Sequence, residues 1–157
     1  MAQAAEVADP SVLMKLMPSS VQIVIVTDAG VLVAIFVDDG TWGGMARARV
    51  RNEDLAAPEL IDLEVTSALR GLLRVGKVNE FRARLALADL RRLPLRRASH
   101  QGLVTRCWEL RDNLTAYDAS YVALAELLGA TLVTTDARLS RAPHIMCSVE
   151  LLPRTDK

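Results

Sequence analysis

Residues 113–136 read NLTAYDASYVALAELLGATLVTTD, and this stretch indicates both a fold class and a site. Residues 117–128 carry the apolar periodicity of a helix that packs against a core. Residues 130–135, ATLVTT, predict a short buried strand. Two carboxylates interrupt this apolar pattern, because Asp118 lies near the start of the helix and Asp136 directly follows the strand. These two charged groups in an apolar segment need an explanation, either as structural caps or as parts of a site.

The alternation of strand and helix continues over the rest of the chain. Apolar β-branched runs and breaker residues predict strands at 21–27, 54–57, 93–97 and 146–152. Helical periodicity predicts helices at 30–37, 41–51, 58–76 (with Pro58 in the first turn), 78–91 and 101–112. Strands that alternate with helices indicate an α/β fold whose central parallel β-sheet is covered by helices on both faces.

Length and composition limit the classes of protein that fit. The 157 residues suit one domain, and 51% hydrophobic residues allow a sizeable core. We expect an N-terminal extension at 1–20, with an alternative start at Met14 or Met17, then the domain at 21–152 and a tail at 153–157. The 19 basic and 19 acidic residues cancel, so any nucleic-acid site must be a local patch.

The cysteines and the apolar runs indicate a cytoplasmic protein. Cys107 and Cys147 lie outside any Cys-x-x-Cys spacing, and His100 and His144 do not complete a zinc site with them. Free buried thiols suit a reducing compartment. No run is long enough for a membrane span, so we expect no membrane partner.

Each candidate carboxylate has an ordinary structural explanation when taken singly. Thr115-x-x-Asp118 has the spacing of a capping box, and Asp28 and Asp136 each suit the N-cap of a following helix. Glu64, in LIDLEVTSALR, is a boundary residue that reaches water in the simplest interpretation.

Taken together, the four carboxylates indicate a metal site. Asp28 and Asp136 end parallel strands at the same edge of the sheet, and Glu64 and Asp118 lie early in helices on inward faces. Such a cluster repels itself unless cations lie between its members. Oxygen ligands without Cys or His favour Mg²⁺ or Mn²⁺. These ions commonly serve the cleavage or transfer of phosphate esters.

This quartet and its surrounding phrases resemble the acidic residues of PIN-domain nucleases. Asp28 after the first strand, Glu64 in LIDLEVTSALR, Asp118 in NLTAYDASYVALAE and Asp136 in LVTTDARL are similar in order and spacing to VapC-type toxins of toxin–antitoxin pairs. The resemblance covers roughly residues 22–152 and implies a three-layer α/β/α PIN-like domain. It also implies that all four carboxylates are catalytic metal ligands, with Thr134 supporting the site.

The resemblance carries further expectations about activity and partners. It implies a Mg²⁺-dependent endoribonuclease, with Mn²⁺ able to substitute, that cuts cellular RNA and inhibits translation and growth. It implies a homodimer that a VapB-type antitoxin neutralises by placing a basic residue against the acidic pocket.

One departure keeps an alternative open. Gly30 stands two residues after Asp28, where the family commonly has Ser, Asn or Thr, so Asp28 loses a side-chain hydrogen bond. The alternative is therefore a catalytically weak or inactive PIN-like module that binds RNA or protein. A Mg²⁺-dependent phosphatase is disfavoured, because Asp28, Ala29 and Gly30 lack its Asp-x-Asp motif.

Candidate RNA contacts lie outside the quartet. Arg111 and Asn113 precede the Asp118 helix, and Trp42 stands in a polar break where we expect it to be exposed. Trp108 and Tyr121 fall on apolar helical stripes and are expected in the core. The basic cluster Arg91, Arg92, Arg96 and Arg97 is more readily explained as a solvated rim.

Overall fold

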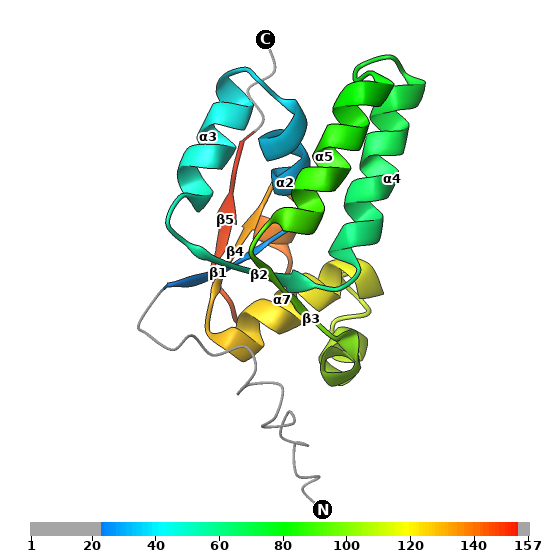
Figure 1. Ribbon diagram of the computed structural model, residues 1–157. Helices are drawn as coiled ribbons and strands as arrows, with labels where there is room; N and C mark the ends of the chain where they lie inside the picture. Colours follow the sequence, from blue (N-terminus) through cyan, green and yellow to red (C-terminus); the bar gives the residue numbers. More distant parts are fainter. Residues whose placement is uncertain (1–22, 154–157) are drawn as a thin grey trace, which may run out of the picture.

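A central parallel sheet organises the molecule, which a computed structural model describes over residues 23–153 (Figure 1). Its strands pair in the order β3-β2-β1-β4-β5, and every neighbouring pair is parallel. The strands are β1 (Val24–Thr27), β2 (Asp54–Pro58), β3 (Leu95–Ala98), β4 (Thr131–Thr134) and β5 (Val149–Leu151). The predicted extension at 1–20 lies outside the described residues.

Helices cover both faces of this sheet and make a three-layer α/β/α fold, as predicted. The helices are α2 (Ala29–Val37), α3 (Thr41–Val50), α4 (Ile61–Arg74), α5 (Glu80–Arg92), α6 (Val104–Glu109) and α7 (Ala116–Leu128), with short 3₁₀ turns η1 (His100–Leu103) and η2 (Leu139–Arg141). Helix α7 packs on β1, β2 and β4, while α2 to α5 group on the other side (Figure 1).

The register of the central strands decides where a site can form. Val26 of β1 pairs with Ala56 of β2 on one side and with Leu132 of β4 on the other. The chain builds the sheet outward from β1 in one direction and then returns to add β4 on its other side. A crevice at such a switch point, outside the carboxyl ends of the strands, is the usual site location in this class of sheet.

The core explains why the central strands read as continuous apolar runs. Ile25, Val26, Leu132 and Val133 are fully buried because helices cover both faces of the sheet. Residues 119–125 of α7 are all buried as well, so this helix has no solvated face through its middle.

Helix and strand ends differ from the predictions in two places that have clear physical reasons. Pro58 belongs to β2 and pairs with Ala98 of β3, beyond Ala56, the last residue of β2 that pairs with β1, so α4 begins only at Ile61. The helix predicted at 101–112 is split into η1 and α6, and α6 ends at Glu109. The predicted end of α7 is confirmed, since Gly129 has φ 59° at the C-cap.

Within residues 23–153, none of the helices combines the length and the apolar character needed to cross a membrane.

Candidate active site

The four candidate carboxylates line one cavity at the carboxyl edge of β1 and β4. The cavity has a volume of about 190 Å³, and its lining comprises Asp28, Ala29, Gly30, Glu64, Asp118, Tyr121, Asp136 and Leu139. The side chains come from four places in the chain: the ends of β1 and β4 and the first turns of α4 and α7. The structure therefore brings together residues that lie up to 108 positions apart, from Asp28 to Asp136.

Asp28 is the most deeply held member of the cluster. Its Oδ1 accepts a hydrogen bond from the Val31 N–H at 2.9 Å, which caps α2 as predicted. Its Oδ2 accepts from the Thr134 hydroxyl and from the Thr135 N–H at 3.1 Å. Burial raises the pKa of Asp28, and these hydrogen bonds oppose the rise only in part. Asp28 is therefore both a helix cap and a rigid, desolvated wall of the cavity.

Thr134 connects two of the carboxylate positions. Its fully buried hydroxyl donates to Asp28 and accepts from the Asp136 N–H at 2.9 Å. One hydroxyl thus ties the end of β1 to the backbone of the segment that carries Asp136.

Glu64 has a partner that the sequence did not indicate. The Tyr121 hydroxyl donates to Glu64 Oε2 at 2.5 Å, joining α7 to α4 across the cavity. Burial raises the pKa of Glu64, the Tyr121 hydrogen bond opposes this, and the charges of Asp118 and Asp28 raise it further. Tyr121 is 2% exposed, so its expected place in the core is confirmed, but its phenol also lines the site. A phenol on a buried apolar stripe needs a hydrogen-bond partner, and this need was the feature of the sequence that could have indicated a polar contact for Tyr121.

Thr115 caps α7 as predicted, but the Asp118 carboxylate accepts from the Thr115 hydroxyl in place of the backbone N–H that a capping box would use. The Asp118 N–H donates to the Thr115 hydroxyl at 3.1 Å, and that hydroxyl donates to Asp118 Oδ2 at 2.9 Å. Asp118 therefore both contacts the N-cap residue of α7, through one carboxylate oxygen, and lines the cavity.

Asp136 is held by an arginine that the sequence analysis did not single out. Arg138 Nη2 lies 2.6 Å from Asp136 Oδ2, and the Arg138 N–H donates to Oδ1 at 2.8 Å. This arginine lowers the pKa of Asp136, chiefly through the side-chain hydrogen bond. The turn replaces the predicted helix at Ala137, and the 3₁₀ turn η2 begins at Leu139.

The donor set fits a hard divalent cation. Within the described residues, no three Asp, Glu, His or Cys side chains are already arranged around one point as metal ligands. However, four carboxylates share a small cavity, and the pKa values of Asp28 and Glu64 are raised by burial and by nearby negative charge. Tyr121 already binds an oxygen of Glu64, and Arg138 already binds an oxygen of Asp136, so a bound ion would share these carboxylates with them. A divalent cation would offset this repulsion, and oxygen ligands select Mg²⁺ or Mn²⁺.

The Gly30 departure is compensated in space. Asp28 is held by three hydrogen bonds despite the glycine. A β-carbon built on Gly30 would lie 2.0 Å from Thr135 Oγ1, so the threonine fills the place of a side chain at residue 30. Glycine at residue 30 donates no side-chain hydrogen bond to Asp28, but Val31, Thr134 and Thr135 hold this carboxylate instead.

The aromatic candidates are placed differently from the predictions. Trp42 is half-buried and packs against the core, so its predicted exposure is wrong. Trp108 is 69% exposed, so its predicted burial is also wrong. Val104, four residues before Trp108 in α6, is exposed as well, so the apolar stripe of this helix faces solvent instead of the core. Arg111 and Asn113 are exposed in the connection between α6 and α7.

Two members of the basic cluster, Arg96 and Arg97, are neutralised by neighbouring carboxylates. Arg96 Nη2 lies 2.8 Å from Asp54 Oδ2, and Arg97 makes a bidentate contact with Asp62 at 2.7 and 2.9 Å. These pairs support the interpretation of this cluster as part of the protein's own surface.

A PIN-domain family model matches residues 25–145 of the chain. The chain belongs to the PIN-domain family. Among characterised relatives, it is similar to ribonuclease VapC9 of Mycobacterium tuberculosis, with 43% identity over 130 residues, or 83% of this chain and 99% of the relative. The resemblance to VapC-type proteins that the sequence motifs indicate is thereby confirmed.

Solved structures agree with this fold. The PIN-domain chain is similar to Mycobacterium tuberculosis VapC20, a sarcin–ricin loop cleaving toxin, with a TM-score of 0.60, 17% identity and coverage of 78% of this chain and 96% of that one. It is also similar to VapBC2 from Rickettsia felis bound to a promoter DNA fragment, with a TM-score of 0.57, 15% identity and coverage of 81% and 98%. At these identities the likeness concerns the fold alone.

Proposed function

We propose that this protein is the toxin of a VapBC-type toxin–antitoxin pair and that it stops growth by cutting cellular RNA in the cytoplasm. Its place among the VapC ribonucleases makes it an endoribonuclease, a hydrolase of phosphodiester bonds. The observation that carries the proposal is the cavity in which Asp28, Glu64, Asp118 and Asp136 meet. Inhibition of translation follows from the loss of the RNA that is cut.

The proposed cofactor is Mg²⁺, which Mn²⁺ can replace. When bound among the four carboxylates, such an ion would neutralise them, activate water and stabilise the charge that develops on the phosphate. The chain's own part is to hold the carboxylates in place. Thr134 orients Asp28, Tyr121 orients Glu64, and Thr115 orients Asp118.

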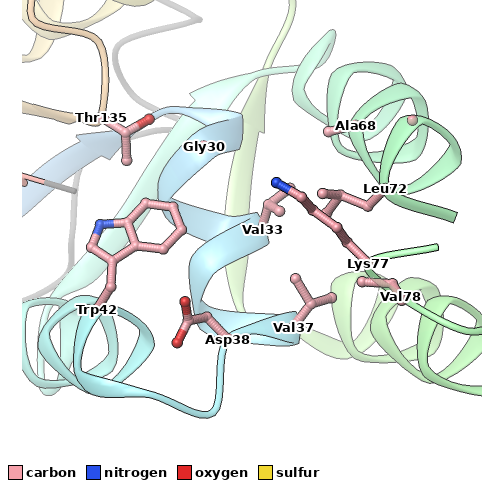
Figure 2. Close-up of a pocket in the computed structure, with 11 residues that line it drawn as sticks. Gly30, Val33, Val37, Asp38, Trp42, Ala68, Leu72, Lys77, Val78 and Thr135 are labelled. Carbon is pink, nitrogen blue, oxygen red and sulfur yellow. The ribbon is translucent and has the colours of Figure 1, made fainter. Parts of the chain in front are cut away.

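An apolar pocket beside the cavity supports an antitoxin as partner. It has a volume of about 520 Å³, and Val33, Val37, Trp42 and Leu72 contribute to its lining (Figure 2). Gly30 lines both this pocket and the acidic cavity. We propose that an apolar segment of a VapB-type antitoxin occupies the pocket and presents a basic residue to the carboxylates. The 43% identity to ribonuclease VapC9 supports this partner class.

The proposal also includes a homodimer of the toxin, which light scattering of the purified chain tests directly.

A growth assay tests the proposed activity without a guess about the RNA target. We expect induction of the wild-type chain to arrest a bacterial host and Asp118→Asn to abolish the arrest. Asp112→Asn is the matched control, because its side chain is 79% exposed and lies outside the cavity lining. Equal arrest by wild type and Asp118→Asn would contradict the proposal, since toxicity would then not need the acidic cavity.

A further inference from the structure

A second groove lies next to the acidic cavity, on the side formed by η1, α6 and the start of α7. Its volume is about 590 Å³. Three large side chains on its lining are unusually open to solvent: Val104 is 55% exposed, Trp108 69% and Tyr117 66%. Exposed aromatic side chains gathered in one groove indicate a binding surface.

A cation is fixed on one of these aromatic rings. The Arg111 guanidinium lies 4.7 Å from the centroid of the Trp108 ring, and Arg111 Nη1 donates to the Trp108 carbonyl at 2.9 Å. Arg111 Nε is 3.9 Å from Asp112 Oδ1, which is too far for a hydrogen bond. By contrast, Arg106 on α6 bonds Glu126 at 2.7 Å and Glu109 at 2.9 Å. The charge of Arg111 is therefore much less neutralised and is available to an anion.

The first turns of α7 lie between the groove and the cavity. Thr115, Tyr117 and Ser120 line the groove, whereas Asp118 and Tyr121 line the cavity. The same division occurs near the start of α4, where Leu60 lines the groove and Glu64 lines the cavity. A linear substrate that leaves the cavity over the start of α7 therefore enters the groove.

The charges of the two hollows differ in a way that suits a nucleic acid. Four carboxylates repel a phosphodiester, so the cavity by itself is a poor source of substrate affinity. The groove offers the opposite chemistry, because aromatic faces stack on unpaired bases and a guanidinium pairs with phosphate.

We propose that this groove binds an unpaired base of single-stranded RNA next to the phosphodiester that is cut. The base stacks on Trp108 or Tyr117, and a neighbouring phosphate pairs with Arg111. This inference rests on the proposed function, since it assigns part of the RNA substrate to a surface beside the same site. It extends the sequence-based candidate Arg111 and replaces Trp42 with Trp108 as the stacking residue.

The fluorescence of Trp108 can report whether a base stacks on its ring. The chain has two tryptophans, so Trp42→Phe leaves Trp108 as the single indole. We would titrate this variant with a short single-stranded RNA of mixed sequence in EDTA, where cleavage is not required. Stacking predicts quenching of Trp108 emission by the single strand and much weaker quenching by an RNA duplex.

Affinity measurements on variants complete the test. In the same metal-free buffer, we expect Trp108→Ala to weaken binding of a labelled single-stranded RNA about tenfold. Arg111→Ala should weaken binding and reduce its salt dependence. Phe81→Ala is the control, because Phe81 is 77% exposed on α5, outside the groove lining, and should leave the affinity unchanged.

The outcomes separate this inference from the proposed function. Absent quenching together with wild-type affinity in Trp108→Ala would overturn the groove assignment. Light scattering that shows a dimer lost in Trp108→Ala, with unchanged RNA affinity, would overturn it in favour of a second copy of the chain. Quenching and weakened binding in a wild-type protein that fails to cut RNA with Mg²⁺ would support the groove and contradict the proposed activity instead.

Discussion

The Thr135 hydroxyl occupies the space that a side chain on Gly30 would need, since Oγ1 lies 2.0 Å from the position of a β-carbon at residue 30. Thr135 also donates its N–H to Asp28 at 3.1 Å. Gly30 and Thr135 thus form a complementary pair at the boundary between the acidic cavity and the apolar pocket (Figure 2).

This pair predicts a non-additive double mutant. Gly30→Ala should force Thr135 to move, whereas Gly30→Ala in a Thr135→Ala background has more room. Helix propensity favours alanine equally in both backgrounds and cancels in the comparison. We expect a coupling free energy of about 1 kcal/mol from urea unfolding of the four proteins. Simple additivity would show that the threonine rotates away without cost.

The link between Tyr121 and Glu64 predicts a loss of activity without loss of the fold. Tyr121→Phe removes the hydroxyl that donates to Glu64 Oε2 and leaves the ring in the core. We expect kcat/KM for RNA cleavage to fall about tenfold, because the carboxylate loses a charge-assisted hydrogen bond that orients it. Thr66→Val is the control, since it removes an exposed hydroxyl of α4 that lies outside the cavity lining. Unchanged kinetics in Tyr121→Phe would show that this hydrogen bond does not position Glu64.

Arg138 predicts a change in metal affinity. Its guanidinium binds both oxygens of Asp136 and therefore competes with a cation for this carboxylate. Arg138→Ala should tighten Mn²⁺ binding several-fold in calorimetry, because a nearby positive charge is removed and Asp136 is released. Arg141→Ala, three residues further along, is the control and should leave the affinity close to that of the wild type. Weaker Mn²⁺ binding in Arg138→Ala would contradict the competition.

The raised pKa values of Asp28 and Glu64 predict how stability depends on pH in the absence of metal. Their ordinary values are 3.8 and 4.5, and burial raises both in the folded state. The folded state therefore holds these protons more tightly than the unfolded state, so their contribution is full below the ordinary values and is lost as pH rises through the raised ones. In EDTA, the free energy of unfolding of the wild type should fall more steeply as pH increases than that of Glu64→Gln. Parallel pH profiles for the two proteins would contradict a desolvated Glu64.

The residues that could be predicted from the sequence are those governed by local patterns. The runs at β1 and β4 are apolar because both faces are covered, so strand type, parallel pairing and the shared edge of Asp28 and Asp136 followed directly. The inward position of Glu64 and Asp118 followed from helical periodicity.

Features that depend on tertiary packing or on turn geometry could not be predicted in this way. The Tyr121–Glu64 hydrogen bond spans 57 positions and depends on how α4 and α7 pack. Trp108 is exposed because the apolar stripe that it shares with Val104 on α6 faces solvent, which helical periodicity alone does not reveal. Arg138 lies beside Asp136 through a tight turn rather than the helix expected there.

The most direct test of the central claim is cleavage of RNA by the purified chain with and without divalent metal. We predict that total bacterial RNA is cut by the wild type and by Asp112→Asn with Mg²⁺ or Mn²⁺, that EDTA stops the reaction, and that Asp118→Asn does not cut although it remains folded. Equal cleavage by wild type and Asp118→Asn, or cleavage that persists in EDTA, would contradict a metal-dependent site built from Asp28, Glu64, Asp118 and Asp136.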